Sequence, residues 1–337
     1  MALAQGGKLT EERSEALPSV CAQLGIGSPA ELAGRLAEAD YIASESLATS
    51  IYLALALRRP LLLEGEAGVG KTEVAKTLAR LLGSPLIRLQ CYEGIDASQA
   101  LYEWNYSGQL LHLRTVEMVR QSHGEQLDAS IEDELYSDRF LVRRPLLRAL
   151  DPIGSGDTLP SANGRLLPAV LLIDELDRAD DEFEAFLLEA LSDYAATIPE
   201  LGTIVSQVPP VVIITSNRTR DLHDALKRRC LYHWVDHPDF ETEVRIIMTR
   251  VPGATELLAK EVAVLSEQLR SMGLFKPPGV AESIDWVRSL QALGAADMTE
   301  ELFSQSLASV VKYKEDAEKA KSQDVSELIR LAVARAR

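Results

Sequence analysis

The chain has 337 residues, of which 46% are hydrophobic and 26% are charged, and its formal net charge at pH 7 is −16. This length allows two domains with cores of their own, and the composition is ordinary for a globular protein. So acidic a surface repels phosphate backbones, which argues against a protein whose task is bulk DNA or RNA binding.

The sequence predicts neither a signal peptide nor a membrane span. The first twenty residues carry charges and lack an apolar stretch. The apolar run 51–57 stops at Arg58-Arg59, far short of the ~20 residues that a span needs. Cys21, Cys91 and Cys230 are far apart and have no metal-ligand spacing, which favours a reducing compartment. We expect a cytoplasmic protein.

Strands and helices alternate through the first two thirds of the chain. Residues 1–35 are expected to form a polar leader with a short helix, and 39–57 a helix that leads into the first strand. The expected strands are 61–63, 86–91, 169–173, 211–215 and 231–235, with a hairpin over 196–204. The stretch between the second and third strands is too long for one crossover helix, so we expect an insertion there, with an acidic helix around 131–135.

This order predicts an α/β fold with a five-stranded parallel sheet between helices. From residue 239 onward only helical patterns remain, broken at Pro252-Gly253, Gly273 and Gly294. We therefore expect a leader at 1–35, an α/β core at 36–238 and an all-helical domain at 239–337.

The first chemical motif is a glycine-rich loop between the first strand and the next helix. It matches the P-loop pattern G-x-x-x-x-G-K-[ST] at every defined position. Its backbone N–H groups can surround a phosphate, Lys71 can reach the β- and γ-phosphates, and Thr72 can bind Mg²⁺. We expect Lys71 to lie at the surface of the loop. We expect ATP to bind at Gly65, Glu66, Ala67, Gly68, Val69, Gly70, Lys71 and Thr72.

The second motif is Asp174-Glu175 at the end of an apolar strand. Carboxylates at the carboxyl end of a parallel strand lie on the ligand side of the sheet. Asp174 can hold Mg²⁺, directly or through water, and Glu175 can act as the general base toward the attacking water.

Two further signals are weaker when each is taken alone. Asn217 ends a strand expected beside the P-loop strand, where it can orient water or simply form a turn. Arg228 and Arg229 precede a strand taken to be buried, too far along the sheet to serve their own P-loop easily. They can stabilise transition-state charge at a neighbour's γ-phosphate, or be solvated charges at a helix end.

The order of these signals resembles that of the AAA+ ATPases. The segments 61–74, 170–180, 197–203, 214–220 and 224–238 resemble the MoxR family in particular. Lys276-Pro277-Pro278-Gly279 and the residues up to Trp286 resemble its CoxD-like branch, which is linked to carbon monoxide dehydrogenase maturation. The resemblance covers residues 40–337.

The resemblance implies a homo-oligomeric ring, usually a hexamer, with ATP at each subunit interface. Asn217 would be the sensor 1 residue, and Arg228 and Arg229 would act in trans. The insertion and the 196–204 hairpin would face the pore or a partner. Family members work with a von Willebrand factor A domain protein and remodel a client enzyme, such as a metalloenzyme.

One departure from the family pattern concerns the helical lid domain at 239–337. The stretch Val280-Ala281-Glu282 lacks the sensor 2 arginine of many relatives, and Arg288 follows two turns later.

Four functions are compatible with a P-loop. An ATP-hydrolysing remodeller is favoured by Glu175 and the arginine pair. A small-molecule kinase would have to avoid activating water, and the acidic charge disfavours a nucleic-acid motor. An ATP-gated interaction module with little hydrolysis would carry the same motifs.

Overall fold

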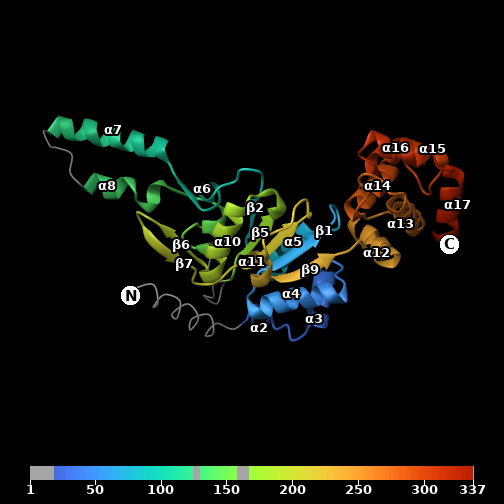
Figure 1. The fold of residues 1–337 in the computed structure, drawn as a ribbon, viewed down its shortest axis with the longest axis horizontal. Coiled ribbons are helices and arrows are strands. Elements are labelled where there is room, and N and C mark those ends of the chain that lie inside the picture. The colour runs from blue at the N-terminus through green and yellow to red at the C-terminus, as the bar shows by residue number, and fades with distance from the viewer. Residues whose placement is uncertain (1–18, 124–129, 158–166, 337) are drawn as a thin grey trace. The chain divides into compact units, whose positions relative to one another are not determined.

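The chain forms a five-stranded parallel sheet in the strand order β2-β5-β8-β1-β9 (Figure 1). The computed structural model describes residues 19–123, 130–157 and 167–336. The strands are β1 (Leu61–Gly65), β2 (Leu86–Gln90), β5 (Val170–Asp174), β8 (Val211–Ser216) and β9 (Leu231–Val235). The expected P-loop NTPase fold with a C-terminal helical region is confirmed.

Burial along the strands follows their places in the sheet. β1, β5 and β8 are buried at every residue, as expected for inner parallel strands covered on both faces. β9 lies at one edge, and only Val235 in it is buried. The expectation that residues 231–235 form a buried strand was therefore wrong, because an edge strand has a neighbour on one side only.

The chain divides into two compact units. Among the described residues, the first comprises 19–27, 50–62, 78–123, 130–157 and 167–232, and the second comprises 28–49, 63–77 and 233–336. The division expected from the sequence, 1–35, 36–238 and 239–337, stays a prediction, and residues 1–18 of the expected leader lie outside the described residues.

Helices of the first unit pack on the sheet and form one core. α9 (Pro145–Leu150) lies against β2 and β5, and α10 (Asp181–Asp193) contacts α11 (Asp224–Arg229). Phe183 and Leu187 of α10 belong to the same buried cluster as Leu147, Leu171 and Ile214.

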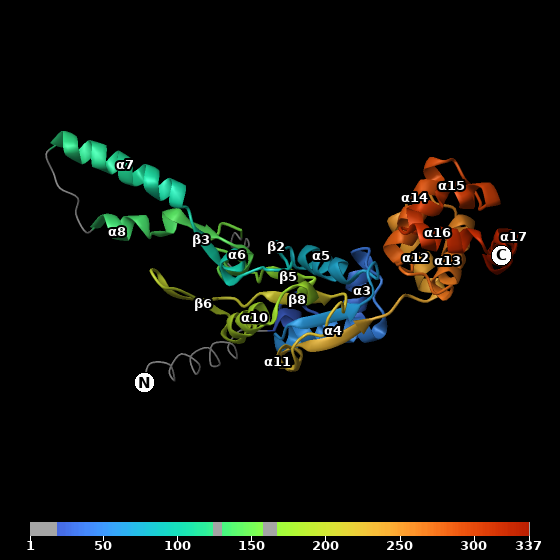
Figure 2. The ribbon, with the colours of Figure 1, turned by 45° about the horizontal axis from the view of Figure 1, so that its top comes forward.

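The expected insertion between β2 and β5 forms an arm (Figure 2). Its strands β3 (Tyr102–Trp104) and β4 (Leu141–Arg143) pair antiparallel. Beyond them α7 (Tyr106–His123) contacts α8 (Ser130–Leu135), the helix expected from the acidic stretch. The short helices α6 (Ala97–Ala100) and η1 (Asp138–Phe140) flank the strands.

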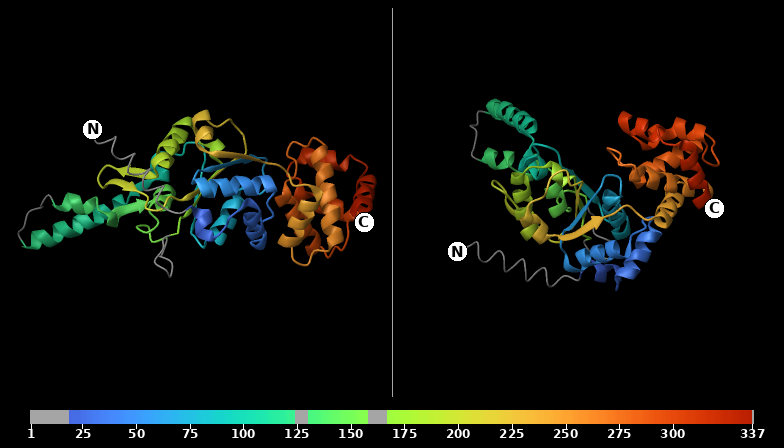
Figure 3. Two further views of the ribbon diagram at one scale, coloured as in Figure 1. Left: turned by 90° about the horizontal axis from the view of Figure 1, so that it is seen from below. Right: turned by 45° about the vertical axis from the view of Figure 1, so that its right-hand side comes forward.

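A second antiparallel pair, β6 (Ala195–Ile198) with β7 (Gly202–Val205), is the expected hairpin. It follows α10 directly, and Ser206 N–H closes its base on the carbonyl oxygen of Tyr194 at 2.9 Å. Figure 3 shows the hairpin as a ribbon separate from the five-stranded sheet.

The second unit contains a helical bundle at the C-terminal end of the chain. Its core is built around Trp286 and Phe303, both fully buried. The Trp286 indole N–H donates to Ser306 Oγ at 2.7 Å, so its one polar group is paired. The helices are α12 (Phe240–Arg250), α13 (Glu256–Ser271), α14 (Val280–Ala292), α15 (Glu300–Val310), α16 (Lys314–Lys321) and α17 (Val325–Ala336).

The helix expected over 39–57 begins later than expected. α2 (Val20–Leu24) and α3 (Pro29–Glu38) are short, and α4 runs over Glu45–Leu57 rather than from residue 39. Ser44 caps α4, since its Oγ accepts the Leu47 N–H at 3.2 Å, and Asp40 has a left-handed φ of 60°. Within the described residues no helix is both long and apolar enough to cross a membrane.

Candidate nucleotide site

The glycine-rich loop has the strand–loop–helix setting that the motif requires. It leaves β1 at Gly65 and enters α5 (Lys71–Leu82) at Lys71. Gly68 and Gly70 have φ values of 81° and 96°, a conformation that residues with a Cβ rarely adopt. The loop can therefore turn its N–H groups toward an anion at the amino end of α5.

Lys71 is buried, with 6% of its surface exposed. Its ammonium donates to the carbonyl oxygens of Gly65 and Glu66, both at 2.7 Å. The expectation that Lys71 lies at the surface of the loop was wrong, because the loop wraps around the ammonium and supplies acceptors to it.

The amino end of the lid helix α14 packs against the glycine-rich loop. Ala281 N–H donates to the Gly68 carbonyl oxygen at 3.2 Å, and Glu282 Oε2 accepts the Gly279 N–H at 3.0 Å. A Cβ built on Gly68 would lie 2.6 Å from Glu282 Oε2. A carboxylate thus stands beside the loop in the first turn of α14. Arg288 instead lies near Asp285, with 3.3 Å between Nη1 and Oδ1.

Asp174, the last residue of β5, is buried with both carboxylate oxygens engaged. Oδ2 accepts Arg88 Nε at 3.0 Å together with a second bond from the same guanidinium, and Oδ1 accepts the Thr215 hydroxyl. Arg88 lies on β2 and Thr215 on β8, the two strands that flank β5. The position of Asp174 is therefore fixed from both sides.

Glu175 follows in a left-handed turn, with φ 55° and ψ 50°. That conformation is costly for a residue with a Cβ and persists where surrounding contacts enforce it. The Glu175 N–H donates to Thr215 Oγ1 at 3.0 Å, and Gln90 Nε2 donates to Glu175 Oε2 at 3.1 Å. Arg178 adds an ion pair at 3.6 Å. Strain of this kind gathers at functional sites, and here it aims a carboxylate at the carboxyl end of the sheet.

Asn217 is joined to the Asp174–Glu175 region through Asp177. Its N–H donates to Asp177 Oδ1 at 3.1 Å, and the Thr219 N–H donates to Oδ2 at 2.9 Å. Burial acts to raise the pKa of Asp177, but the hydroxyl and N–H of Thr219 and the N–H of Asn217 lower it below its ordinary value. Asn217 follows β8, which is next to β1 in the sheet, as expected.

The acidic residues also affect Cys91, which follows β2. Its pKa is raised to about 12, first by burial and then by Asp174, Asp177 and Glu175. This buried cysteine therefore stays a neutral thiol at physiological pH.

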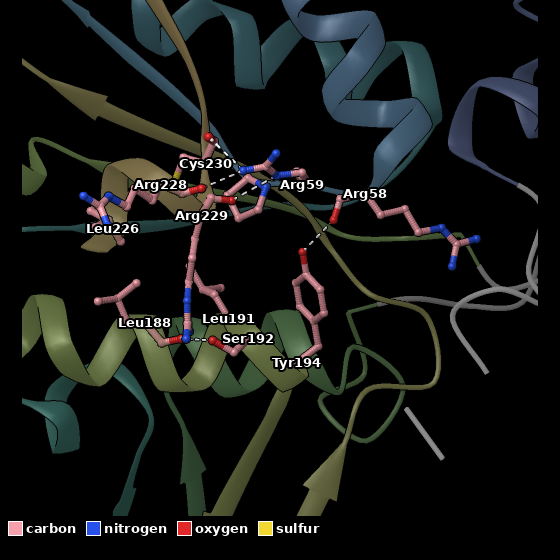
Figure 4. Close-up of a pocket in the computed structure, with 11 residues that line it drawn as sticks. Arg58, Arg59, Leu188, Leu191, Ser192, Tyr194, Leu226, Arg228, Arg229 and Cys230 are labelled. Carbon is pink, nitrogen blue, oxygen red and sulfur yellow. Dashed lines mark hydrogen bonds between the residues drawn. The ribbon is translucent and has the colours of Figure 1, made fainter. Parts of the chain in front are cut away.

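Arg228 and Arg229 are not among the contacts of Asp174, Glu175 and Asn217; they lie at the end of α11 (Figure 4). Arg229 Nη1 donates to the Leu188 carbonyl oxygen of α10 at 2.8 Å. Both arginines line a cavity of about 390 Å³ together with Arg58, Arg59 and Tyr194. Arg58 and Arg59 precede β1, whereas the glycine-rich loop follows it, so this cavity is at the opposite end of that strand.

A comparison with protein families matches residues 60–230 to the AAA domain, dynein-related subfamily. The match begins just before β1, ends at Cys230 after the arginine pair, and covers half of the chain. The chain belongs to this AAA domain family. Membership implies nucleotide binding and agrees with the P-loop NTPase fold.

Relatives of this AAA domain protein occur in staphylococci. An uncharacterized protein of Staphylococcus epidermidis is 23% identical over 241 residues, which are 69% of this chain and 76% of that protein. Another, of Staphylococcus saprophyticus, is 23% identical over 263 residues, 76% of this chain and 84% of that protein.

Solved structures with a similar fold include RuvB, the Holliday junction branch migration motor of Thermotoga maritima. Its identity is 16%, its TM-score is 0.41, and the match covers 79% of this chain and 69% of that one. A single-residue variant of the same protein gives a TM-score of 0.43 at 16% identity, over 80% of this chain and 70% of that one.

The roles of three residues were not assigned from the sequence. Arg88 and Gln90 hold Asp174 and Glu175, and Arg59 binds the end of α11. Arg88 and Gln90 alternate with the apolar Ile87 and Leu89, so a period of two along β2 marked them as polar side chains on one face. Nothing local marked Arg59, because its partners lie about 170 residues later in the chain.

Among the described residues, no group of three or more His, Cys, Asp or Glu side chains is arranged to hold a metal ion. Magnesium in nucleotide sites usually takes one or two protein oxygens, with phosphate and water oxygens completing its shell. In the first unit, the Asp174 carboxylate is an oxygen ligand of this kind, although Arg88 and Thr215 engage both its oxygens in this structure. In the second unit, Thr72 carries a hydroxyl at the start of α5.

Proposed function

We propose that this protein is an ATP-hydrolysing AAA+ ring ATPase that remodels or matures a client protein. The observation that carries the proposal is the placement of Glu175. Its left-handed turn after the buried strand β5 fixes a carboxylate beside Asp174. Backbone strain of this kind gathers at functional sites, which supports a catalytic role for the acid at this position.

In this proposal each residue has one task. The loop Gly65–Gly70 binds the phosphates, and Lys71 exchanges its two carbonyl acceptors for phosphate oxygens. Glu175 accepts the proton of the attacking water, and Asn217 orients that water or the γ-phosphate. The strand order supports the grouping, since carboxyl ends of parallel strands share one edge and β8 lies between β1 and β5.

Thr72 and Asp174 would hold Mg²⁺. The bound ion supplies positive charge against the phosphate oxygens. The protein's part is to present the two oxygens and to hold Asp174 still through Arg88 and Thr215.

Arg228 and Arg229 would act on the nucleotide of a neighbouring copy. They lie at the amino end of β9 beside the segment that precedes β1, whereas the P-loop follows β1. Five residues of strand rise by about 16 Å, which supports action in trans over action on the same subunit's phosphates. AAA+ proteins typically assemble, and a hexamer is the ring we propose.

The finer family assignment is also a proposal: the MoxR family and its CoxD-like branch, with a von Willebrand factor A domain partner and a metalloenzyme client. The arm supports a protein partner. On α7, Tyr106, Leu110, Leu111 and Met118 are each more than half exposed. Exposed apolar side chains on one helix are typical of a contact surface.

A second candidate is an ATP-gated interaction module with little hydrolysis. The contacts of Asp174 and Glu175 favour it, because Arg88, Gln90 and Arg178 engage both carboxylates in the described state. A small-molecule kinase is a third candidate that the same assay can exclude.

The test is phosphate release from ATP by the full chain, alone and with a candidate von Willebrand factor A domain protein, duplex DNA, or a panel of small hydroxyl and amine acceptors. The proposal predicts release by the protein alone that the partner protein increases. Nucleotide binding without release under every condition would favour the gated module. Release of ADP without phosphate, only when an acceptor is present, would identify a kinase.

A further inference from the structure

Arg59 binds the end of the helix that carries the arginine pair. Its Nη2 donates to the carbonyl oxygens of Arg228 at 2.9 Å and Cys230 at 3.2 Å, and its Nε donates to that of Arg229 at 3.2 Å (Figure 4). The last carbonyl groups of a helix lack partners within the helix, and a cation there also suits the helix dipole. One guanidinium thus satisfies three successive carbonyl groups.

The segment around Arg59 is itself held on both sides. Before it, the Arg58 carbonyl oxygen accepts the Tyr194 hydroxyl at 3.0 Å, and Arg58 has a left-handed φ of 52°. After it, the Pro60 carbonyl oxygen accepts the Leu231 N–H at 2.8 Å. A left-handed arginine persists where its surroundings enforce that conformation. The Arg59 side chain therefore projects from a fixed base.

The arginine pair gains a second support from α10. The bond from Arg229 Nη1 to the Leu188 carbonyl oxygen holds that guanidinium on the wall of the cavity. The helix α11 has only six residues, and so short a helix depends on contacts with the rest of the fold. Arg59 fixes its backbone and Leu188 fixes one of its side chains.

We propose that Arg59 is a positioning residue for Arg228 and Arg229. It fixes the backbone that carries both arginine side chains, and in a ring Arg229 would leave the Leu188 carbonyl oxygen to reach a neighbouring copy's nucleotide. This inference rests on the proposed ATPase function and on the trans action of the pair. Misplacing a catalytic group by about 1 Å can cost on the order of 10²-fold in rate, so loss of Arg59 should lower turnover without removing any group that touches ATP.

Arg59 and the phosphate site of its own subunit lie at opposite ends of β1. Arg59 precedes β1, and the glycine-rich loop follows that strand. An Arg59→Ala subunit should therefore keep a working P-loop and lose only what it supplies to its neighbour.

The test compares Arg59→Ala with Arg59→Lys and Arg58→Ala. Arg58→Ala removes an adjacent positive charge that points away from these carbonyl groups and keeps the carbonyl that Tyr194 binds (Figure 4). Each variant is measured for affinity toward a fluorescent ATP analogue, for kcat and KM in phosphate release, and for thermal unfolding. We expect Arg59→Ala to lower kcat on the order of 10²-fold at unchanged KM and affinity. The kcat of Arg59→Lys should lie between those of Arg59→Ala and the wild type, since an ammonium can bind some of the carbonyl groups. The kcat of Arg58→Ala should match the wild type.

A mixture of Arg59→Ala and Lys71→Ala subunits gives the decisive readout. The first protein contributes an intact P-loop and the second an intact arginine pair, so ATPase activity should recover. Two results with single variants would overturn the inference: a loss of ATP affinity in Arg59→Ala, or wild-type kcat in both Arg59→Ala and Arg59→Lys. It is also overturned if this mixture stays inactive while a mixture of Arg229→Ala and Lys71→Ala recovers activity. Should neither mixture recover, the trans arrangement of the proposed function has failed as well.

Discussion

At the scale of single residues, the backbone of Glu175 is the most informative feature. A glutamate in the left-handed region costs about 1–3 kcal/mol, and the fold meets this cost through Thr215 and Gln90. Thr215 also binds Asp174, so one hydroxyl couples the two acids. The two carboxylates are therefore held in one fixed arrangement.

We predict that Glu175→Gln keeps ATP bound and stops its hydrolysis. The amide preserves the shape of the side chain and loses its basicity, so the ATP-bound state should become long-lived. Single-turnover hydrolysis and retention of labelled ATP on a sizing column measure this directly. Turnover at a near-wild-type rate would exclude Glu175 as the base. Proteins recovered with this variant would identify the client.

Lys71→Ala should lose ATP affinity and some stability of the free protein. Two charge-assisted hydrogen bonds are worth about 3–6 kcal/mol, so affinity should fall by about two orders of magnitude or more. The carbonyl groups of Gly65 and Glu66 also lose their buried partner, at about 1–3 kcal/mol.

The matched control is Lys76→Ala on the same helix, whose side chain is 52% exposed and lies 3.2 Å from Glu73. It should leave both ATP affinity and stability nearly unchanged. Wild-type affinity of Lys71→Ala for a fluorescent ATP analogue would refute the phosphate site.

At the scale of elements, the lid helix α14 and the glycine-rich loop meet backbone to backbone. A Cβ on Gly279 would lie 2.8 Å from both the Ala67 carbonyl oxygen and the Gly68 Cα. The φ of Gly279 is −86°, which any residue can adopt, so the close approach alone requires glycine here.

Gly279→Ala should therefore lower the thermal unfolding midpoint, because extra atoms in a packed contact cost about 1–3 kcal/mol. Gly34→Ala is the control with the opposite sign. Gly34 is exposed within α3, a Cβ there meets nothing within 4 Å, and alanine is the better helix residue by about 0.5–1 kcal/mol. A Gly279→Ala protein as stable as Gly34→Ala would show that the lid and the loop do not touch.

Elements with strong local patterns were predictable from the sequence. Continuous apolar runs gave β1, β5 and β8, and the glycine and lysine spacing gave the loop at Gly65–Thr72. The bonds of Arg59 and Arg88 join residues 85 or more apart, so no local pattern could reveal them. The burial of Lys71 was missed for a related reason: it depends on where the carbonyl groups of the loop point, which residue types do not specify.

At the scale of the whole molecule, the net charge sets the class of partner. A formal charge of −16 opposes the counterion release that drives DNA binding. We predict no salt-dependent binding of a labelled duplex at about 0.15 M ionic strength. Tight binding that weakens steeply with added salt would support a nucleic-acid motor instead.

The central claim, ATP hydrolysis at sites shared between copies of this chain, is tested most directly by mixing two inactive variants. Arg229→Ala keeps its P-loop and Lys71→Ala keeps its arginine pair. Some interfaces in a mixed ring therefore combine the intact P-loop of one variant with the intact arginine pair of the other. Neither protein alone should release phosphate. We predict that phosphate release returns in the mixture and rises with protein concentration. Mixed assemblies confirmed by sizing that release no phosphate, or a chain that stays monomeric in saturating ATP, would contradict it.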